Sequence, residues 1–266
     1  MLDEKTKIGF YLIGNSSRCS CSKVIKNIFT PVNMEVIPAV EVNDSIHAMF
    51  YSDIGFRARV GRDALQGEIG CALAHQNAYS KVIENQFEWS FIFEDDAHLE
   101  KSDELKVLIN TIKSWSLSRP VVVSFYTDDL VVRKSFSTNV KYMKKTPIPP
   151  PNTVAYILNK QAAKILKDKN RIVKNLADWP ATAKEIDFYL FSDSGVTHGC
   201  VNSSSTIIDS GSFRPTPSLN VKLQIWTGIW FLRYRSTWST YSDFYYGALE
   251  PRIRYKIEQV RQRFSS

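Results

Sequence analysis

The segment from Gly67 to Asp96 constrains the fold most, because a helical pattern runs directly into a buried strand with an acidic end. Its first two thirds are rich in Ala, Leu, Gln and Lys and contain no proline, which predicts a helix. Glu68, His75 and Tyr79 recur at helical spacing and so share one face. Residues 87–93 are mostly aromatic and aliphatic, which predicts a buried strand.

Three carboxylates, Glu94, Asp95 and Asp96, end this predicted strand. Adjacent like charges resist burial, and a divalent cation removes the conflict by supplying the opposite charge. In an open α/β sheet, ligands bind outside the carboxyl ends of the strands. The segment therefore predicts a metal-assisted site for a phosphate-bearing ligand, and the alternative is a solvated acidic turn.

Two motifs carry a resemblance to a known family: GEIGC at residues 67–71 with His75 one turn later, and EDD at residues 94–96. Together they resemble glycosyltransferase family 25, which includes bacterial lipooligosaccharide and collagen galactosyltransferases. Ala74 stands where that family usually has Ser. The resemblance implies an α/β, glycosyltransferase A-like domain with a Rossmann-like, mostly parallel sheet.

The resemblance also implies an activity. It is metal-dependent, inverting transfer of a sugar, galactose from UDP-galactose, onto a glycan acceptor of bacterial lipopolysaccharide, lipooligosaccharide or capsule. One alternative is a transferase of the same fold that uses UDP-glucose or a UDP-N-acetylhexosamine. Another is a non-catalytic scaffold of a glycan-assembly complex, against which the intact acidic triplet argues. The implied partners are a nucleotide sugar and a glycan acceptor that can be lipid-linked.

By resemblance, Asp96 contacts a Mn²⁺ (or Mg²⁺) ion directly, while Glu94 and Asp95 orient the metal or the donor's ribose. An oxygen-rich site suits these cations. His198 follows the last predicted strand and is a candidate to complete the metal coordination.

Donor-binding candidates include Glu68 and His75 on the GEIGC helix. Arg18 joins them, because Leu12 and Arg18 keep the family's Leu-to-Arg spacing after the first strand, although Tyr11 stands where Asn is usual. A structural role for His75 and a surface role for Arg18 are the alternatives.

Direct displacement with inversion needs a general base near the acceptor hydroxyl. Asp178 is the first choice, because family members commonly carry an Asp-Trp pair at this place. Asp187 and Asp128 are its rivals, and a helix cap or a solvated acid is the alternative for each.

The remaining pattern alternates strands with helices, which supports a mostly parallel sheet. Strands are predicted at residues 7–13, 34–40, 120–126, 153–158 and after Glu185, helices at 19–29, 102–114 and 160–167, and loops at 44–62 and 139–151.

The composition favours a cytoplasmic location. No leader or spanning segment is expected, and the four cysteines lack disulfide or zinc spacing, so we expect reduced thiols. Residues 1–220 are predicted to form the catalytic domain, and residues 221–266 a basic, aromatic and helical extension. From residue 220 onward the chain has eight Lys and Arg and three acidic residues, and the difference of +5 is most of the net charge of +7.

Basic and aromatic residues together favour an anionic membrane surface. We therefore expect peripheral contact of the extension with the inner face of the cytoplasmic membrane. The alternatives are packing on the catalytic domain or a dimer contact, and the oligomeric state stays open. A nucleic-acid partner fits poorly, because the basic residues accompany no recognised motif.

Overall fold

The computed structural model describes residues 8–15, 34–60, 62–85, 87–99, 103–115, 118–126, 135–140, 142–177, 179–191 and 196–198. All of them belong to the first of the two units into which the chain divides, Met1–Ser218 and Leu219–Ser266. The predicted helix at 19–29 and the extension at 221–266 lie outside the described residues. No helix among the described residues has both the length and the apolar character needed to cross a bilayer.

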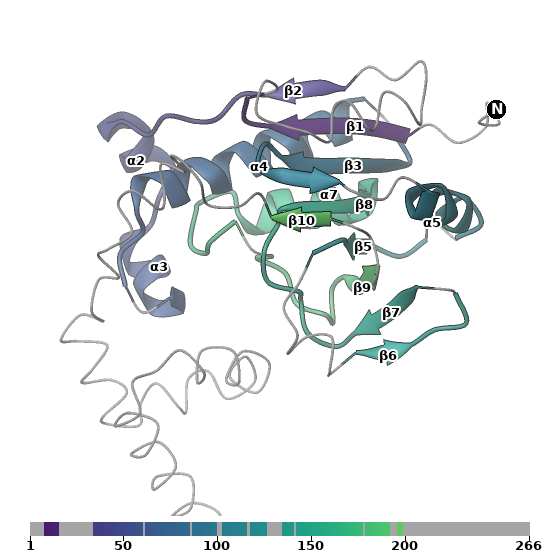
Figure 1. Ribbon diagram of the computed structural model, residues 1–266. Coiled ribbons are helices and arrows are strands. Elements are labelled where there is room, and N and C mark those ends of the chain that lie inside the picture. Colours follow the sequence, from purple (N-terminus) through teal and green to yellow (C-terminus); the bar gives the residue numbers. More distant parts are fainter. Residues whose placement is uncertain are drawn as a thin grey trace, which may run out of the picture. The chain divides into compact units, whose positions relative to one another are not determined.

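An eight-stranded sheet forms the centre of the described part (Figure 1). In spatial order its strands are β2 (Glu35–Ile37), β1 (Ile8–Ile13), β3 (Trp89–Glu94), β8 (Ala155–Asn159), β5 (Val121–Ser124), β9 (Asp187–Phe191), β7 (Met143–Thr146) and β6 (Phe136–Ser137). Strands β7 and β8 run against the other six. The α/β fold class with a mostly parallel sheet is therefore confirmed.

Helices and a small second sheet cover the two faces of the sheet. Helices α4 (Gln66–Glu84) and α7 (Lys160–Lys169) pack on one face through Ala and Leu side chains. Helix α5 (Asp103–Lys113) packs on the other, together with the paired strands β4 (Ala97–Leu99) and β10 (Val196–His198). This layering follows from the alternation of side chains along β1 and β3, which sends successive apolar residues to opposite faces.

Two short helices replace the loop predicted at 44–62, so that prediction was wrong. They are α2 (Asp44–Phe50) and α3 (Asp53–Val60). Helix α2 buries no residue and is seven residues long, which is too short for its apolar residues to form a repeated helical pattern. Its start is fixed instead by Asn43, whose side chain accepts a hydrogen bond from the Ile46 N–H at 2.9 Å. The loop predicted at 139–151 likewise contains a strand, β7.

Helix α4 lies very close to the segment that follows β2. A Cβ atom on Gly70 would stand 2.3 Å from the backbone oxygen of Val40. A side chain at this position therefore has no room, and the absence of one lets α4 approach the sheet edge. Ile69, Leu73 and Val173 fill the adjoining apolar space. This contact determines how closely α4 packs at this end of the sheet.

Candidate active site

The end of β3 forms an acidic tip against the end of β1. Glu94 pairs in register with Ile13, and Asp95 and Asp96 follow at the carboxyl edge of the sheet. The Asp95 carboxylate accepts a hydrogen bond from the Asn15 N–H at 2.9 Å. Gly14 has φ +104°, and a Cβ there would stand 2.5 Å from the same carboxylate oxygen. Asp95 is thus held by the turn that leaves β1.

Glu94 is oriented by residues from two other elements. Its Oε1 accepts a hydrogen bond from Thr153 Oγ1 at 2.7 Å and lies 3.1 Å from His75 Nε2. Its backbone N–H donates to the oxygen of Val154 at 2.8 Å. Because β8 runs against β3, the residues that begin β8 reach the same sheet edge where β3 ends. One fifth of the Glu94 side chain stays exposed.

Behind Glu94 lies a buried polar chain. His75 is 1% exposed, and its Nδ1 lies 2.8 Å from Tyr156 Oη. Tyr156 Oη in turn donates to Tyr79 Oη at 3.2 Å. Burial raises the pKa of Tyr156 well above its ordinary value, and Tyr79 and Glu94 raise it further, so the phenol stays neutral.

These hydrogen bonds fix what His75 can offer. Since Tyr156 donates to Tyr79, its oxygen accepts the Nδ1–H of His75. The Nε2 atom then faces the Glu94 carboxylate, and either a second ring proton or a cation satisfies both atoms. His75 is predicted to bind the donor. The structure buries it, and its link to the tip runs through Glu94.

Glu68 lies at the start of α4 and is held within the chain. Arg62 contacts both of its carboxylate oxygens, at 2.7 and 2.5 Å, and the Leu65 N–H donates to it at 2.9 Å. This is the Glu half of a capping box. Seven residues separate Glu68 from His75, about 10 Å along a helix axis. The donor-binding role of Glu68 stays a prediction.

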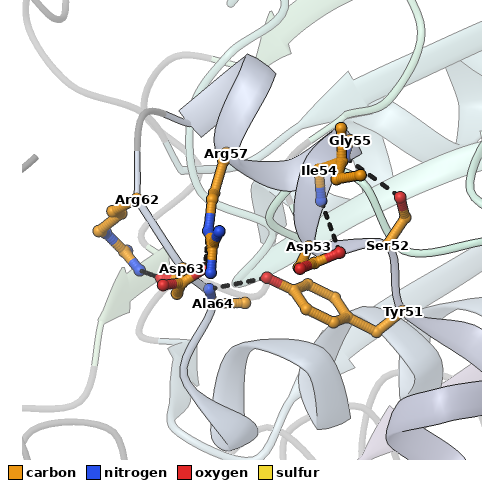
Figure 2. A network of polar contacts seen from close by, with 9 residues as sticks. All are labelled: Tyr51, Ser52, Asp53, Ile54, Gly55, Arg57, Arg62, Asp63 and Ala64. Atoms are coloured by element: carbon orange, nitrogen blue, oxygen red, sulfur yellow. Dashed lines mark hydrogen bonds and ion pairs between the residues drawn. The ribbon is translucent and has the colours of Figure 1, made fainter. Parts of the chain in front are cut away.

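Figure 2 shows the network that leads into α4 and ends at Arg62. Arg62 also donates to the backbone oxygen of Asp63 at 2.9 Å. The Asp63 carboxylate accepts from Arg57, and the Ala64 N–H donates to Tyr51 Oη at 3.1 Å. These contacts tie α3 to the start of α4, which explains the position of Glu68 without a ligand.

Asp187 lies at the amino ends of the parallel strands, whereas Glu94 lies at their carboxyl ends. It pairs with Val121, and the register through β5 and β8 brings it level with Trp89, the first residue of β3. Five residues of strand are about 16 Å. The Asp187 carboxylate is 8% exposed and contacts Arg119 at 3.0 Å and Lys145 at 2.9 Å. The structure gives Asp187 two ion pairs and does not bring it to the tip.

Three predicted site residues, Asp178, Asp128 and Arg18, lie outside the described residues. For His198 the backbone alone is described. It pairs with Ala97, the residue that directly follows Asp96, so the backbone of β10 runs beside the acidic tip. These four assignments stay predictions.

Trp179, the neighbour of Asp178, is anchored close to the buried polar chain. Its Nε1–H donates to the oxygen of Pro150 at 2.5 Å, and its ring lies edge-on to Tyr156 with centroids 4.8 Å apart. The sequence analysis named neither Thr153 nor Tyr156 as a site residue. The direction of a strand is not encoded in its apolar pattern, so nothing indicated that the start of β8 would meet the end of β3.

An open α/β sheet with carboxylates at the end of a central strand is suited to a ligand that carries a cation or phosphate. The sequence profile of glycosyltransferase family 25 (LPS biosynthesis protein) matches residues 21–180. The chain therefore belongs to glycosyltransferase family 25.

A curated relative and two solved structures are similar to this chain. Lipooligosaccharide biosynthesis protein lex-1 of Haemophilus influenzae (strain ATCC 51907 / DSM 11121 / KW20 / Rd) is 32% identical over 113 residues, 37% of this chain and 35% of that protein. The match thus spans little more than a third of the relative. Mannose-1-phosphate geranyltransferase from Thermus thermophilus is 7% identical, with 70% of this chain and 75% of that chain covered and a TM-score of 0.40. A197 from STIV is 9% identical, with 75% and 97% covered and a TM-score of 0.40. These two scores are too low to transfer any property.

Proposed function

We propose that the protein transfers a sugar, galactose from UDP-galactose, with inversion onto a glycan acceptor of bacterial lipopolysaccharide, lipooligosaccharide or capsule. Membership of glycosyltransferase family 25 supports glycosyl transfer. The single observation that carries the proposal is the acidic tip, which lies at the carboxyl edge of the sheet, where α/β proteins bind phosphate-bearing ligands.

The tip fits the Mn²⁺ or Mg²⁺ ion that the family resemblance implies. Its described side chains are all carboxylates, which suit these hard cations, and His198 stays a candidate further ligand. Asp96 and Glu94 would hold the ion, and Asp95 braces the tip against β1 through the Asn15 N–H. When bound, such an ion neutralises charge on the departing diphosphate.

The residues behind the tip have a positioning role in this proposal. Thr153 and His75 both engage Oε1 of Glu94, so the carboxylate is fixed in one direction before any ligand arrives. Preorganised groups of this kind need no rearrangement during the reaction. His75 thus serves the donor site through Glu94 and does not itself touch the nucleotide.

Asp178 remains the proposed general base. Its neighbour Trp179 packs on Tyr156 and binds the backbone at Pro150, three residues before Thr153. These contacts hold Trp179 beside the polar chain behind the tip, whereas Asp187 lies at the other end of the parallel strands. We expect Asp178→Asn to lower turnover by about 10²–10⁴-fold with little change in donor affinity. A loss below about tenfold would shift the role to Asp128.

A donor panel tests the function. UDP-galactose, UDP-glucose and UDP-N-acetylhexosamines are each incubated with the full chain, with Mn²⁺ or with a chelator, and released UDP is measured. We expect turnover of UDP-galactose with metal alone, and its loss in Asp96→Ala. Glu84→Ala, an exposed carboxylate in the last turn of α4, is the matched control and should be active. Turnover by Asp96→Ala at the wild-type rate would remove Asp96 from the metal site, and absence of nucleotide binding would favour a scaffold.

A further inference from the structure

A second group of possible metal ligands lies immediately behind the acidic tip. Cys71 and His75 stand one turn apart on the same face of α4, and Glu94 faces them from the end of β3. One thiol, one imidazole and one carboxylate donor atom all lie within 4.8 Å of one another. Among the described side chains, these three form a group with the composition of a metal centre.

The His75 ring already has the orientation of a metal ligand. Metal-bound histidines usually donate their other ring N–H to a fixed partner, which holds the ring in place. Tyr156 is that partner here, at 2.8 Å from Nδ1, and its own hydroxyl donates to Tyr79. The lone pair of Nε2 is thereby directed towards Glu94.

The distance between His75 and Glu94 agrees with one shared cation. Bonds of about 2.0–2.1 Å to nitrogen and oxygen at a tetrahedral angle place the two ligand atoms about 3.3 Å apart. His75 Nε2 and Glu94 Oε1 are 3.1 Å apart. Without a proton or metal ion between them, two acceptors would face each other in a site where His75 is 1% exposed.

The ligand types select the kind of cation. Sulfur and imidazole ligands favour Zn²⁺ and similar ions, whereas Mg²⁺ and Mn²⁺ favour oxygen alone. The group therefore differs in chemistry from the all-carboxylate tip beside it. Cys71 is half-buried and reduced, and Glu94 is partly exposed, so an ion can enter from the side of the tip.

We propose that Cys71, His75 and Glu94 bind a thiophilic divalent cation of the Zn²⁺ class, with its fourth coordination position open. Binding releases the thiol proton of Cys71 and the proton between His75 Nε2 and Glu94 to solvent, and the proton on His75 Nδ1 stays hydrogen-bonded to Tyr156. The site goes beyond the transfer reaction, because no step of that reaction needs a thiol. Glu94 belongs to both donor sets, so a thiophilic ion, which such a mixed sulfur and nitrogen site binds far more tightly than Mg²⁺, takes this carboxylate from the oxygen-only site.

Cobalt absorption spectroscopy on the full chain tests the site without any activity measurement. Co²⁺ replaces Zn²⁺ in such sites and gives a thiolate-to-cobalt absorption band. We expect the band in the wild-type protein, its loss on adding Zn²⁺, and its persistence in excess Mg²⁺. Displacement by Mg²⁺, or the lack of a band in the folded protein, overturns the proposal.

Variants assign the ligands. Cys71→Ser should abolish the band, whereas a chain with Cys19, Cys21 and Cys200 all changed to Ser should keep it. Tyr156→Phe should keep the band but weaken Co²⁺ binding about 10–100-fold, as loss of a partner behind a ligand does. If Cys71→Ser does not fold, the triple variant decides alone: a band supports the site, and its absence overturns it. A band that survives in folded Cys71→Ser also overturns it.

One consequence rests on the proposed function. If Glu94 serves the transfer reaction, Zn²⁺ added to the Mn²⁺-supported enzyme should inhibit it, and Cys71→Ser should relieve the inhibition. A cobalt band without inhibition would leave the thiophilic site in place and argue against the role of Glu94 in transfer. The two proposals can therefore fail separately.

Discussion

Gly70→Ala offers a direct test of how α4 is placed over the sheet. In most helix interiors this substitution stabilises, because Ala exceeds Gly in helix propensity by about 1 kcal/mol. Here the new Cβ would stand 2.3 Å from the backbone oxygen of Val40, whereas ordinary contacts begin at 3.4 Å. A backbone atom cannot rotate aside, so α4 or the segment after β2 must move by roughly 1 Å.

Overpacking of this kind costs about 1–3 kcal/mol, which exceeds the gain in helix propensity. After the gain of about 1 kcal/mol is subtracted, we expect Gly70→Ala to lower the free energy of unfolding by up to about 2 kcal/mol, measured by urea denaturation. Gly55→Ala on α3 is the matched control. Its Cβ would meet the flexible Lys174 side chain and Ser52 at 3.0 Å, so it should be neutral or slightly stabilising. Equal or greater stability of Gly70→Ala than of wild type would refute the close approach.

Three further predictions concern charge. Asp187→Asn should lower the free energy of unfolding by about 1–2 kcal/mol, because the carboxylate is buried, and the loss stays moderate because its partners Arg119 and Lys145 are exposed. The kcat of the folded enzyme should not change. Lost turnover at unchanged stability would instead make Asp187 the base. Burial raises the pKa of Glu185, but hydrogen bonds from Lys169 and from a threonine outweigh it and lower that pKa below its usual value. The ionised Glu185 therefore stabilises the fold above its unfolded-state pKa, and this stabilisation is lost as pH falls through the folded-state pKa. Glu185→Gln should accordingly lower Tm near neutral pH and have the Tm of wild type in acid. A difference in Tm that is the same at every pH would contradict this. The full chain should bind anionic vesicles at low salt in a co-sedimentation assay, whereas a chain ending at Asn220 should stay in solution. If neither chain binds, the membrane hypothesis is wrong.

The sequence predicted the elements that bury a continuous apolar pattern. Strands β1, β3 and β8 and helices α4, α5 and α7 appear close to their expected bounds, because each has a periodic apolar pattern. Helices α2 and α3 were missed. Their structure depends on side-chain caps such as Asn43 and on the polar network around Tyr51, which leave no periodic trace.

Parts of the candidate site were predictable for a related reason. The acidic tip follows from one continuous segment, so its place at a strand end could be inferred directly. The partners of Glu94 could not, because Thr153 is brought to it by a reversed strand and not by nearness in sequence. The position of Asp187 at the other end of the strands likewise depends on the direction of β9 relative to β3, which composition and spacing do not encode.

The reversed strand β8 has a consequence for the order of events during synthesis. Thr153 lies 59 residues beyond Glu94, and Tyr156 lies 81 beyond His75. At about 5–20 residues per second, the ribosome needs about 3–12 seconds to reach Thr153 after Glu94. During that interval β3 has no β8 to pair with, and the Glu94 carboxylate lacks one of its two anchors. The nascent chain therefore carries its acidic triplet well before Glu94 has both of its anchors.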